Sequence, residues 1–175
     1  MSLVVTVHPS DESANKSPDL VVIFLHGFNM TASEMAEEFV DLFRRFPRVR
    51  FVFPEAPRMC ITAHGGEEGN AWFDYITDRG GSREDMIGLC SLRNERLRLL
   101  NLVAFERRKC GDGVPVLLGG LSQGGCMALD IATRVKDLAG VASCVSHRLS
   151  ISKSRPLADS CRRALCSLSL KISPS

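Results

Sequence analysis

The chain has 175 residues, of which 45% are apolar and 24% charged, with 14 Gly and 8 Pro. This length and composition describe one globular domain and exclude the collagen, coiled-coil and disordered classes. The runs of aliphatic and aromatic residues, that through Val21 to Leu25 included, are far shorter than the roughly 20 residues that a membrane-spanning helix needs. We therefore expect a cytoplasmic protein.

The formal net charge of +2 is unevenly distributed, because residues 146–175 hold six basic residues and a single acidic one. These charges are dispersed and have no aromatic residue among them, which favours a solvated segment, so we expect no nucleic-acid partner. The seven cysteines stand at irregular spacings without a C-x-x-C pair. This pattern argues against a zinc site and against a disulfide framework, so we expect no bound metal and reduced, mostly buried thiols.

The first third of the chain predicts two buried strands separated by a helix. Residues 3–7 form a candidate edge strand, and the polar residues 9–19 follow it. Residues 21–25 are continuously apolar and rich in β-branched side chains, as in a strand covered on both faces of a parallel sheet. A capping box and apolar residues at helical spacing predict a helix over residues 32–45, and residues 49–53 predict the next strand.

The middle of the chain has a different character. Residues 58–81 show no steady period and are rich in glycine, which suggests a long surface excursion. Apolar periodicity then predicts, in order, a helix that opens at Ser82 and ends before Gly111, a strand at 114–118, a helix at 123–136 and a strand at 138–144. Strands and helices alternate throughout, which predicts an α/β fold with a doubly wound parallel sheet and helices on both faces.

A candidate catalytic serine lies between the third strand and the helix after it. Gly120, Ser122 and Gly124 form a G-x-S-x-G match. A strand, a sharp turn and a helix are the setting of a nucleophile elbow, in which glycines allow the close approach of strand and helix. The helix start would also offer backbone N–H groups to an oxyanion. The alternative reading is a glycine-rich turn whose Ser caps the helix.

A second candidate segment, His26-Gly27-Phe28, follows the strand at residues 21–25. The loop after such a strand is where hydrolases of this architecture obtain a further backbone N–H for the oxyanion. We interpret His26 as a structural residue that orients this loop through hydrogen bonds.

Six segments of the sequence together resemble a known protein family. In order and spacing, VIFLHGFNM, VFPEAP, AWFDY, the helix after Glu84, LLGGLSQGGCMAL and LAGVASCVS resemble the phospholipase/carboxylesterase family, which includes acyl-protein thioesterases and lysophospholipases. The match covers roughly residues 20–145. The chain departs from the family at Asn29-Met30, where Gly-Asp is usual.

The resemblance implies an α/β-hydrolase fold with Ser122 as the acyl-accepting nucleophile and the backbone of Phe28 and Gln123 as oxyanion donors. It implies that residues 57–74 border the acyl channel, with Trp72 packing there. The substrates would be acylated proteins, lysophospholipids or small acyl esters, without metal or organic cofactor. Membrane contact would be transient at most.

The carboxyl end does not fit the resemblance. The family's acid and catalytic His lie well beyond the nucleophile, and no equivalent motif follows Ser122 here. His147 is the single His after Ser122 and would emerge at the same sheet edge, which makes it a candidate substitute base. A loop residue without a catalytic role is the other reading of His147.

We accordingly predict three segments: residues 1–19 as an N-terminal strand and polar loop, 20–145 as a partial, C-terminally truncated α/β-hydrolase domain, and 146–175 as a divergent Ser-rich basic tail. One functional hypothesis is a serine esterase or thioesterase. The other is a truncated, catalytically impaired protein that binds acyl chains or partners without turnover. The exposed sheet edge of a truncated fold also suggests self-association.

Overall fold

The computed structural model describes residues 5–8, 17–79, 86–111 and 113–144. His147 and the predicted tail therefore lie outside the described residues. Five strands form the main sheet in the order β1-β3-β2-β6-β7. Their bounds are β1 Val5–His8, β2 Leu20–Leu25, β3 Val49–Pro54, β6 Val116–Leu121 and β7 Gly140–Cys144. Strands β3, β2, β6 and β7 run parallel, and β1 pairs antiparallel with β3 at the edge.

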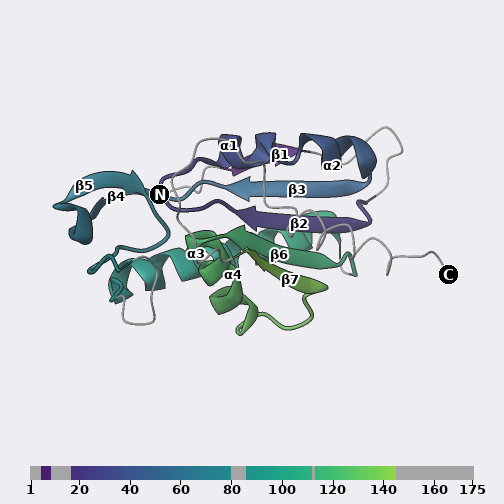
Figure 1. Cartoon of the computed structure of the whole chain (residues 1–175). Coiled ribbons are helices and arrows are strands. Elements are labelled where there is room, and N and C mark those ends of the chain that lie inside the picture. Colours follow the sequence, from purple (N-terminus) through teal and green to yellow (C-terminus); the bar gives the residue numbers. More distant parts are fainter. Residues whose placement is uncertain (1–4, 9–16, 80–85, 112, 145–175) are drawn as a thin grey trace.

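Helices cover both faces of this sheet, which confirms the predicted doubly wound α/β architecture (Figure 1). On one face lie α1 Ala32–Glu37 and α2 Val40–Arg45, and on the other lie α3 Leu89–Cys110 and α4 Gln123–Ala132. Alternate residues of β2 serve the two cores: Val21 and Ile23 face α3 and α4, whereas Val22 and Phe24 face α1 and α2. All six residues of β2 are buried because both of its faces are covered.

The single helix predicted over residues 32–45 is wrong, because the chain forms two short helices there. The predicted capping box does open α1, with Thr31 and Glu34 bonding each other's backbone N–H. The break falls at Phe39, which has φ −100° and ψ 1° and is fully buried. Its ring packs against Phe24, with ring centroids 4.8 Å apart, and against Phe53 at 5.1 Å. Burial of this ring against side chains of β2 and β3 outweighs continuous helical hydrogen bonding.

The excursion over residues 58–81 contains a hairpin that the sequence did not predict. β4 Arg58–Ile61 and β5 Glu67–Asn70 pair antiparallel, with the 3-10 helix η2 Thr62–His64 between them. Gly65 and Gly66 make the turn with φ of 68° and 87°, a region that glycine adopts readily. The hairpin projects at the edge toward which the arrowheads of β2, β3 and β6 point, which is the carboxyl edge of the parallel strands (Figure 1).

The second half of the chain follows the predicted order with shifted bounds, since the strand predicted at 114–118 is β6 at Val116–Leu121. α4 ends at Ala132 instead of residue 136, and β7 begins at Gly140 instead of residue 138. The thiol prediction is only partly right: Cys110 is free and buried, but Cys60, Cys90 and Cys126 are free and exposed, and Cys144 is disulfide-bonded. None of the helices among the described residues is both long enough and apolar enough to cross a membrane.

A buried ion pair fastens α3 to β3. Arg50 Nε donates to Glu106 Oε2 over 2.7 Å, and the side chains are 8% and 2% exposed. Breaking a pair this deep in the protein by removing one of its partners is strongly destabilising.

We predict that Glu106→Ala lowers the free energy of unfolding by about 3 to 5 kcal/mol, because it removes the carboxylate that pairs with the buried Arg50 guanidinium. The double variant Arg50→Met/Glu106→Leu, which removes both charges and keeps apolar volume, should unfold within about 1 kcal/mol of the parent. Urea unfolding followed by circular dichroism measures both. Equal losses in the two variants would contradict this account of the pair.

Candidate functional site

The G-x-S-x-G segment forms a sharp turn between β6 and α4. We refer to Gly120–Gly124 as the elbow turn; β6 ends within it at Leu121 and α4 begins at Gln123. Ser122, between the two elements, has φ 50° and ψ −116°. Positive φ is strained for a residue with a side chain and persists only where surrounding structure enforces it. Ser122 is partly exposed, so the strained residue is accessible from solvent.

Two glycines of the elbow turn permit the backbone contacts that enforce this conformation. A Cβ on Gly120 would lie 2.3 Å from the carbonyl carbon and oxygen of Gly124. A Cβ on Gly124 would lie 2.4 Å from the His26 oxygen and 2.5 Å from the Leu25 oxygen. Only glycine fits such distances, so Gly120 lets the start of α4 lie close to β6 and Gly124 lets it pack directly on the end of β2.

The Gln123 side chain points into the core and joins the elbow turn to the Trp72 segment. Its Oε1 accepts a hydrogen bond from the Trp72 backbone N–H over 2.8 Å, and its Nε2 donates to the Phe73 carbonyl over 2.9 Å. The Trp72 indole is fully buried, and its Nε1 donates to the His26 carbonyl over 2.8 Å. Trp72 thus packs beneath the elbow turn, and its place in a substrate channel stays a prediction.

His26 is fully buried, and both of its ring nitrogens are occupied. Nε2 accepts a hydrogen bond from the Ala56 N–H over 3.0 Å, which leaves the proton on Nδ1, and Nδ1 lies 2.8 Å from the Gly27 carbonyl as its donor. Burial lowers the pKa of His26 below its usual 6.5. A neutral imidazole with no free nitrogen orients the loop after β2, in agreement with the structural interpretation.

The loop after β2 places Phe28 between the elbow turn and the hairpin. Asn29 has φ 57°, a conformation that asparagine tolerates better than most residues, so the loop forms here without the usual Gly-Asp. The Asn29 N–H donates to the Asn70 carbonyl over 2.8 Å, and Asn70 Nδ2 donates to the Met30 carbonyl over 3.1 Å. Among the described residues, the N–H groups of Phe28 and Gln123 have no backbone acceptor.

Sequence reasoning missed a histidine that the hairpin brings to this loop. The ring of His64, at the end of η2, makes an edge contact with the Phe28 ring at a centroid distance of 5.4 Å. His64 Nε2 lies 3.1 Å from Asp78 Oδ2. Tyr75 packs on the Phe28 ring as well, at 5.5 Å. No periodic pattern marks this excursion, so the juxtaposition could only come from the tertiary structure.

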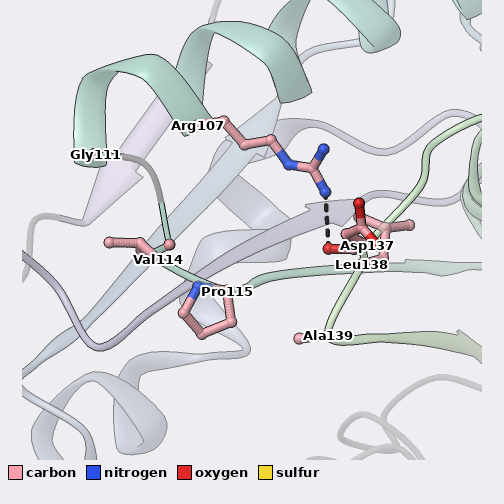
Figure 2. A pocket seen from close by; sticks show the side chains of 8 residues that line it. Arg107, Gly111, Val114, Pro115, Asp137, Leu138 and Ala139 are labelled. Atoms are coloured by element: carbon pink, nitrogen blue, oxygen red, sulfur yellow. Dashed lines mark hydrogen bonds between the residues drawn. The ribbon is translucent and has the colours of Figure 1, made fainter.

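A pocket of about 450 Å³ lies away from the elbow turn (Figure 2). Val114 and Pro115 line it just before β6, and Leu138 and Ala139 line it just before β7, so it sits at the amino ends of the strands. Arg107 reaches across it and donates to the Asp137 carbonyl over 2.9 Å. Within the described ranges, no three His, Cys, Asp or Glu side chains are grouped closely enough to hold a metal ion.

A doubly wound sheet with a strained serine turn at its carboxyl edge defines an α/β-hydrolase-like protein. The chain belongs to the phospholipase/carboxylesterase family, whose model matches residues 7–165. It is 34% identical over 113 residues to acyl-protein thioesterase 1 homolog 2 of Dictyostelium discoideum, covering 62% of this chain and 48% of that protein. It is 31% identical over 140 residues to acyl-protein thioesterase 1 of Neurospora crassa, covering 73% and 54%.

The crystal structure of acyl-protein thioesterase 2 from Zea mays superposes with a TM-score of 0.65 and 16% identity, covering 95% of this chain and 84% of that chain. This likeness shows the shared fold. The chain spans about half the length of the curated relatives it matches.

We predict that Gly124→Ala destabilises the protein by about 3 kcal/mol or more, because the new Cβ would overlap the His26 and Leu25 carbonyls. Gly69→Ala is the matched control: its nearest neighbour would be the Asn29 Oδ1 atom at 3.4 Å, so its loss should stay below about 1 kcal/mol. Thermal unfolding compares the two variants. Equal melting temperatures would mean that the elbow turn does not need glycine at this position.

We predict that the stability of the protein falls as the pH drops below about 6.5, because the unfolded chain protonates His26 there while the buried ring stays neutral. The folded pKa is the lower one, so this contribution is complete above 6.5. Melting temperatures from about pH 8 to about pH 5 test it. His26→Asn should melt lower throughout but with a flatter decline. An unchanged slope in His26→Asn would contradict the assignment.

Proposed function

We infer that this protein is a serine hydrolase of carboxylic esters or thioesters that acts through an acyl-enzyme on Ser122. The observation that carries this inference is the backbone of Ser122, held at φ 50° between β6 and α4. Proteins store such strain chiefly at functional sites, and here it projects a partly exposed serine from the carboxyl edge of the sheet. Membership of the phospholipase/carboxylesterase family supports the same reading.

In the proposed reaction, Ser122 Oγ gives its proton to a base and forms a bond to the acyl carbonyl carbon. The negative charge moves to the carbonyl oxygen, and the N–H groups of Phe28 and Gln123 are proposed to stabilise it. Collapse of this intermediate breaks the C–O or C–S bond, and the leaving alcohol or thiol takes the proton. Water then attacks the acyl-serine, which releases the carboxylic acid and restores Ser122. This sequence needs no metal or organic cofactor.

The proposed reaction needs a base that accepts the proton of Ser122. His26 is unsuited to it because both of its nitrogens are already bonded and burial keeps the ring neutral. His147 is the base that we propose, since it follows β7 in the chain and β7 ends at the same edge as β6. His64, which is paired with Asp78 and touches Phe28, is the second candidate.

The proposed substrates are acylated proteins, lysophospholipids or small acyl esters. The relatives from Dictyostelium discoideum and Neurospora crassa are named acyl-protein thioesterases, and the family name covers phospholipases and carboxylesterases. A thioester and an oxygen ester present the same acyl carbonyl to Ser122, so the proposed site accommodates either leaving group.

We predict that a fluorophosphonate forms one covalent adduct with the parent chain, because this probe reacts with an activated serine, and that Ser122→Ala forms none. Intact-mass spectrometry counts the adducts. Ser33→Ala, which removes an exposed serine of α1, should label like the parent. Hydrolysis of a p-nitrophenyl acyl ester should fall at least about 1,000-fold in Ser122→Ala.

The same assays identify the residue that acts as the base, and they distinguish a hydrolase from a protein that binds acyl chains or partners without turnover. Loss of labelling in His147→Ala identifies His147, and loss in His64→Ala identifies His64 instead. A folded parent chain that neither labels nor hydrolyses the ester would overturn the hydrolase proposal and favour a protein that binds acyl chains or partners without turnover.

A further inference from the structure

The outward side of α3 exposes apolar and basic side chains together. Taking every fourth residue from the start of the helix gives six exposed residues: Leu89, Arg93, Leu97, Asn101, Phe105 and Lys109. The three apolar ones are 59%, 61% and 51% exposed in chain order. Residues four apart are neighbours on a helix surface, so the six form a row about 30 Å long. Each step of four residues turns about 40° past a full turn, so the row winds by about 200° around the helix from Leu89 to Lys109. We call these six residues, with the exposed Arg108 beside them, the α3 stripe.

The acidic side chains of α3 are buried and do not lie in this stripe. Glu95 and Glu106 are the only acidic residues of the helix, and they are 4% and 2% exposed. Glu106 pairs with Arg50 of β3, and Glu95 pairs with Arg98 one turn along the helix. The exposed charges of α3 are therefore all positive, in contrast to the mixed signs usual for a solvated helix.

The core-facing side of α3 is formed by Leu99, Leu102 and Val103, which are buried against the sheet. The exposed Leu and Phe side chains thus contribute nothing to this core. Side chains of this size in a row with cations match the interface of an anionic bilayer, where apolar groups enter the acyl boundary and cations meet the phosphates. The central part of the row, Arg93 to Phe105 with Arg108, keeps within about 120° of the helix circumference and can meet one surface. A fluid lipid surface fits this part without shape matching, whereas an acidic protein would need a pocket for each apolar side chain.

We propose that the α3 stripe docks the protein on negatively charged membrane surfaces. The Gly88 N–H, at the start of α3, donates to the Asp74 carbonyl over 2.8 Å, and Asp74 follows the Trp72-Phe73 segment that Gln123 holds. The Leu89 end of the stripe thereby lies on the side of the molecule that carries the elbow turn. Docking itself does not involve Ser122, so this proposal goes beyond the proposed hydrolase function and stands apart from it.

Flotation of the full chain with lipid vesicles tests the proposal. We expect binding to phosphatidylcholine vesicles that contain phosphatidylserine, no binding to phosphatidylcholine alone, and weaker binding as salt is raised. Arg93→Gln/Arg108→Gln should weaken binding about 25-fold, since each cation near the surface contributes roughly 1 kcal/mol. Leu97→Ser/Phe105→Ser should also weaken binding, although it leaves the net charge unchanged.

The matched control is Arg44→Gln/Arg45→Gln, which removes the same charge from exposed positions of α2 on the opposite face of the sheet. It should bind within about twofold of the parent, and the basic residues beyond residue 145 are identical in all variants. Equal losses in the two arginine doubles would overturn the proposal. So would a failure to bind phosphatidylserine vesicles, which would leave an acidic protein as the partner of the stripe. Ser122→Ala should float like the parent, so failure of docking and failure of the hydrolase proposal are scored separately.

Discussion

The direct contact between the start of α4 and the end of β2 is the constraint on which the rest of the site depends. Gly124 allows it because a Cβ there would lie within 2.5 Å of the His26 and Leu25 oxygens. Gly120 allows the end of β6 to approach the same start of α4, since its Cβ would lie 2.3 Å from the Gly124 carbonyl. Once the helix starts so close to the sheet, Ser122 must turn through a positive φ to join β6 to α4. The same contact brings Gln123 within hydrogen-bond distance of the Trp72-Phe73 segment.

The buried polar side chains of His26, Trp72 and Gln123 beneath the elbow turn are hydrogen-bonded. His26 illustrates the principle: its carbonyl accepts from the Trp72 indole, and its ring bonds Gly27 and Ala56. A buried polar group with every partner in place rigidifies its surroundings, whereas one without partners would destabilise them. The strained serine therefore rests on a network that leaves its neighbours little freedom to relax, and backbone strain persists only under such conditions.

Charge placement in α3 connects the interior to the surface. Because Arg50 enters the core from β3, the helix must supply a buried carboxylate, and Glu106 does so. Glu95 is likewise turned inward, toward Arg98. What remains for the solvent side is a set of cations and large apolar side chains. The stabilisation of the fold and the character of the outer surface are thus two consequences of one distribution of charge along the helix.

The sequence by itself determined the α/β class, the order of the parallel strands β2, β3, β6 and β7 with helical segments between them, and the strand-turn-helix setting of Ser122. These features depend on contiguous residues, namely apolar runs, helical periodicity and a five-residue motif. Only the tertiary structure decided the break at Phe39, the β4–β5 hairpin and the contact of His64 with Phe28. Each of these results from packing between residues distant in the chain, and such packing overrides local propensity without leaving a periodic trace in the sequence.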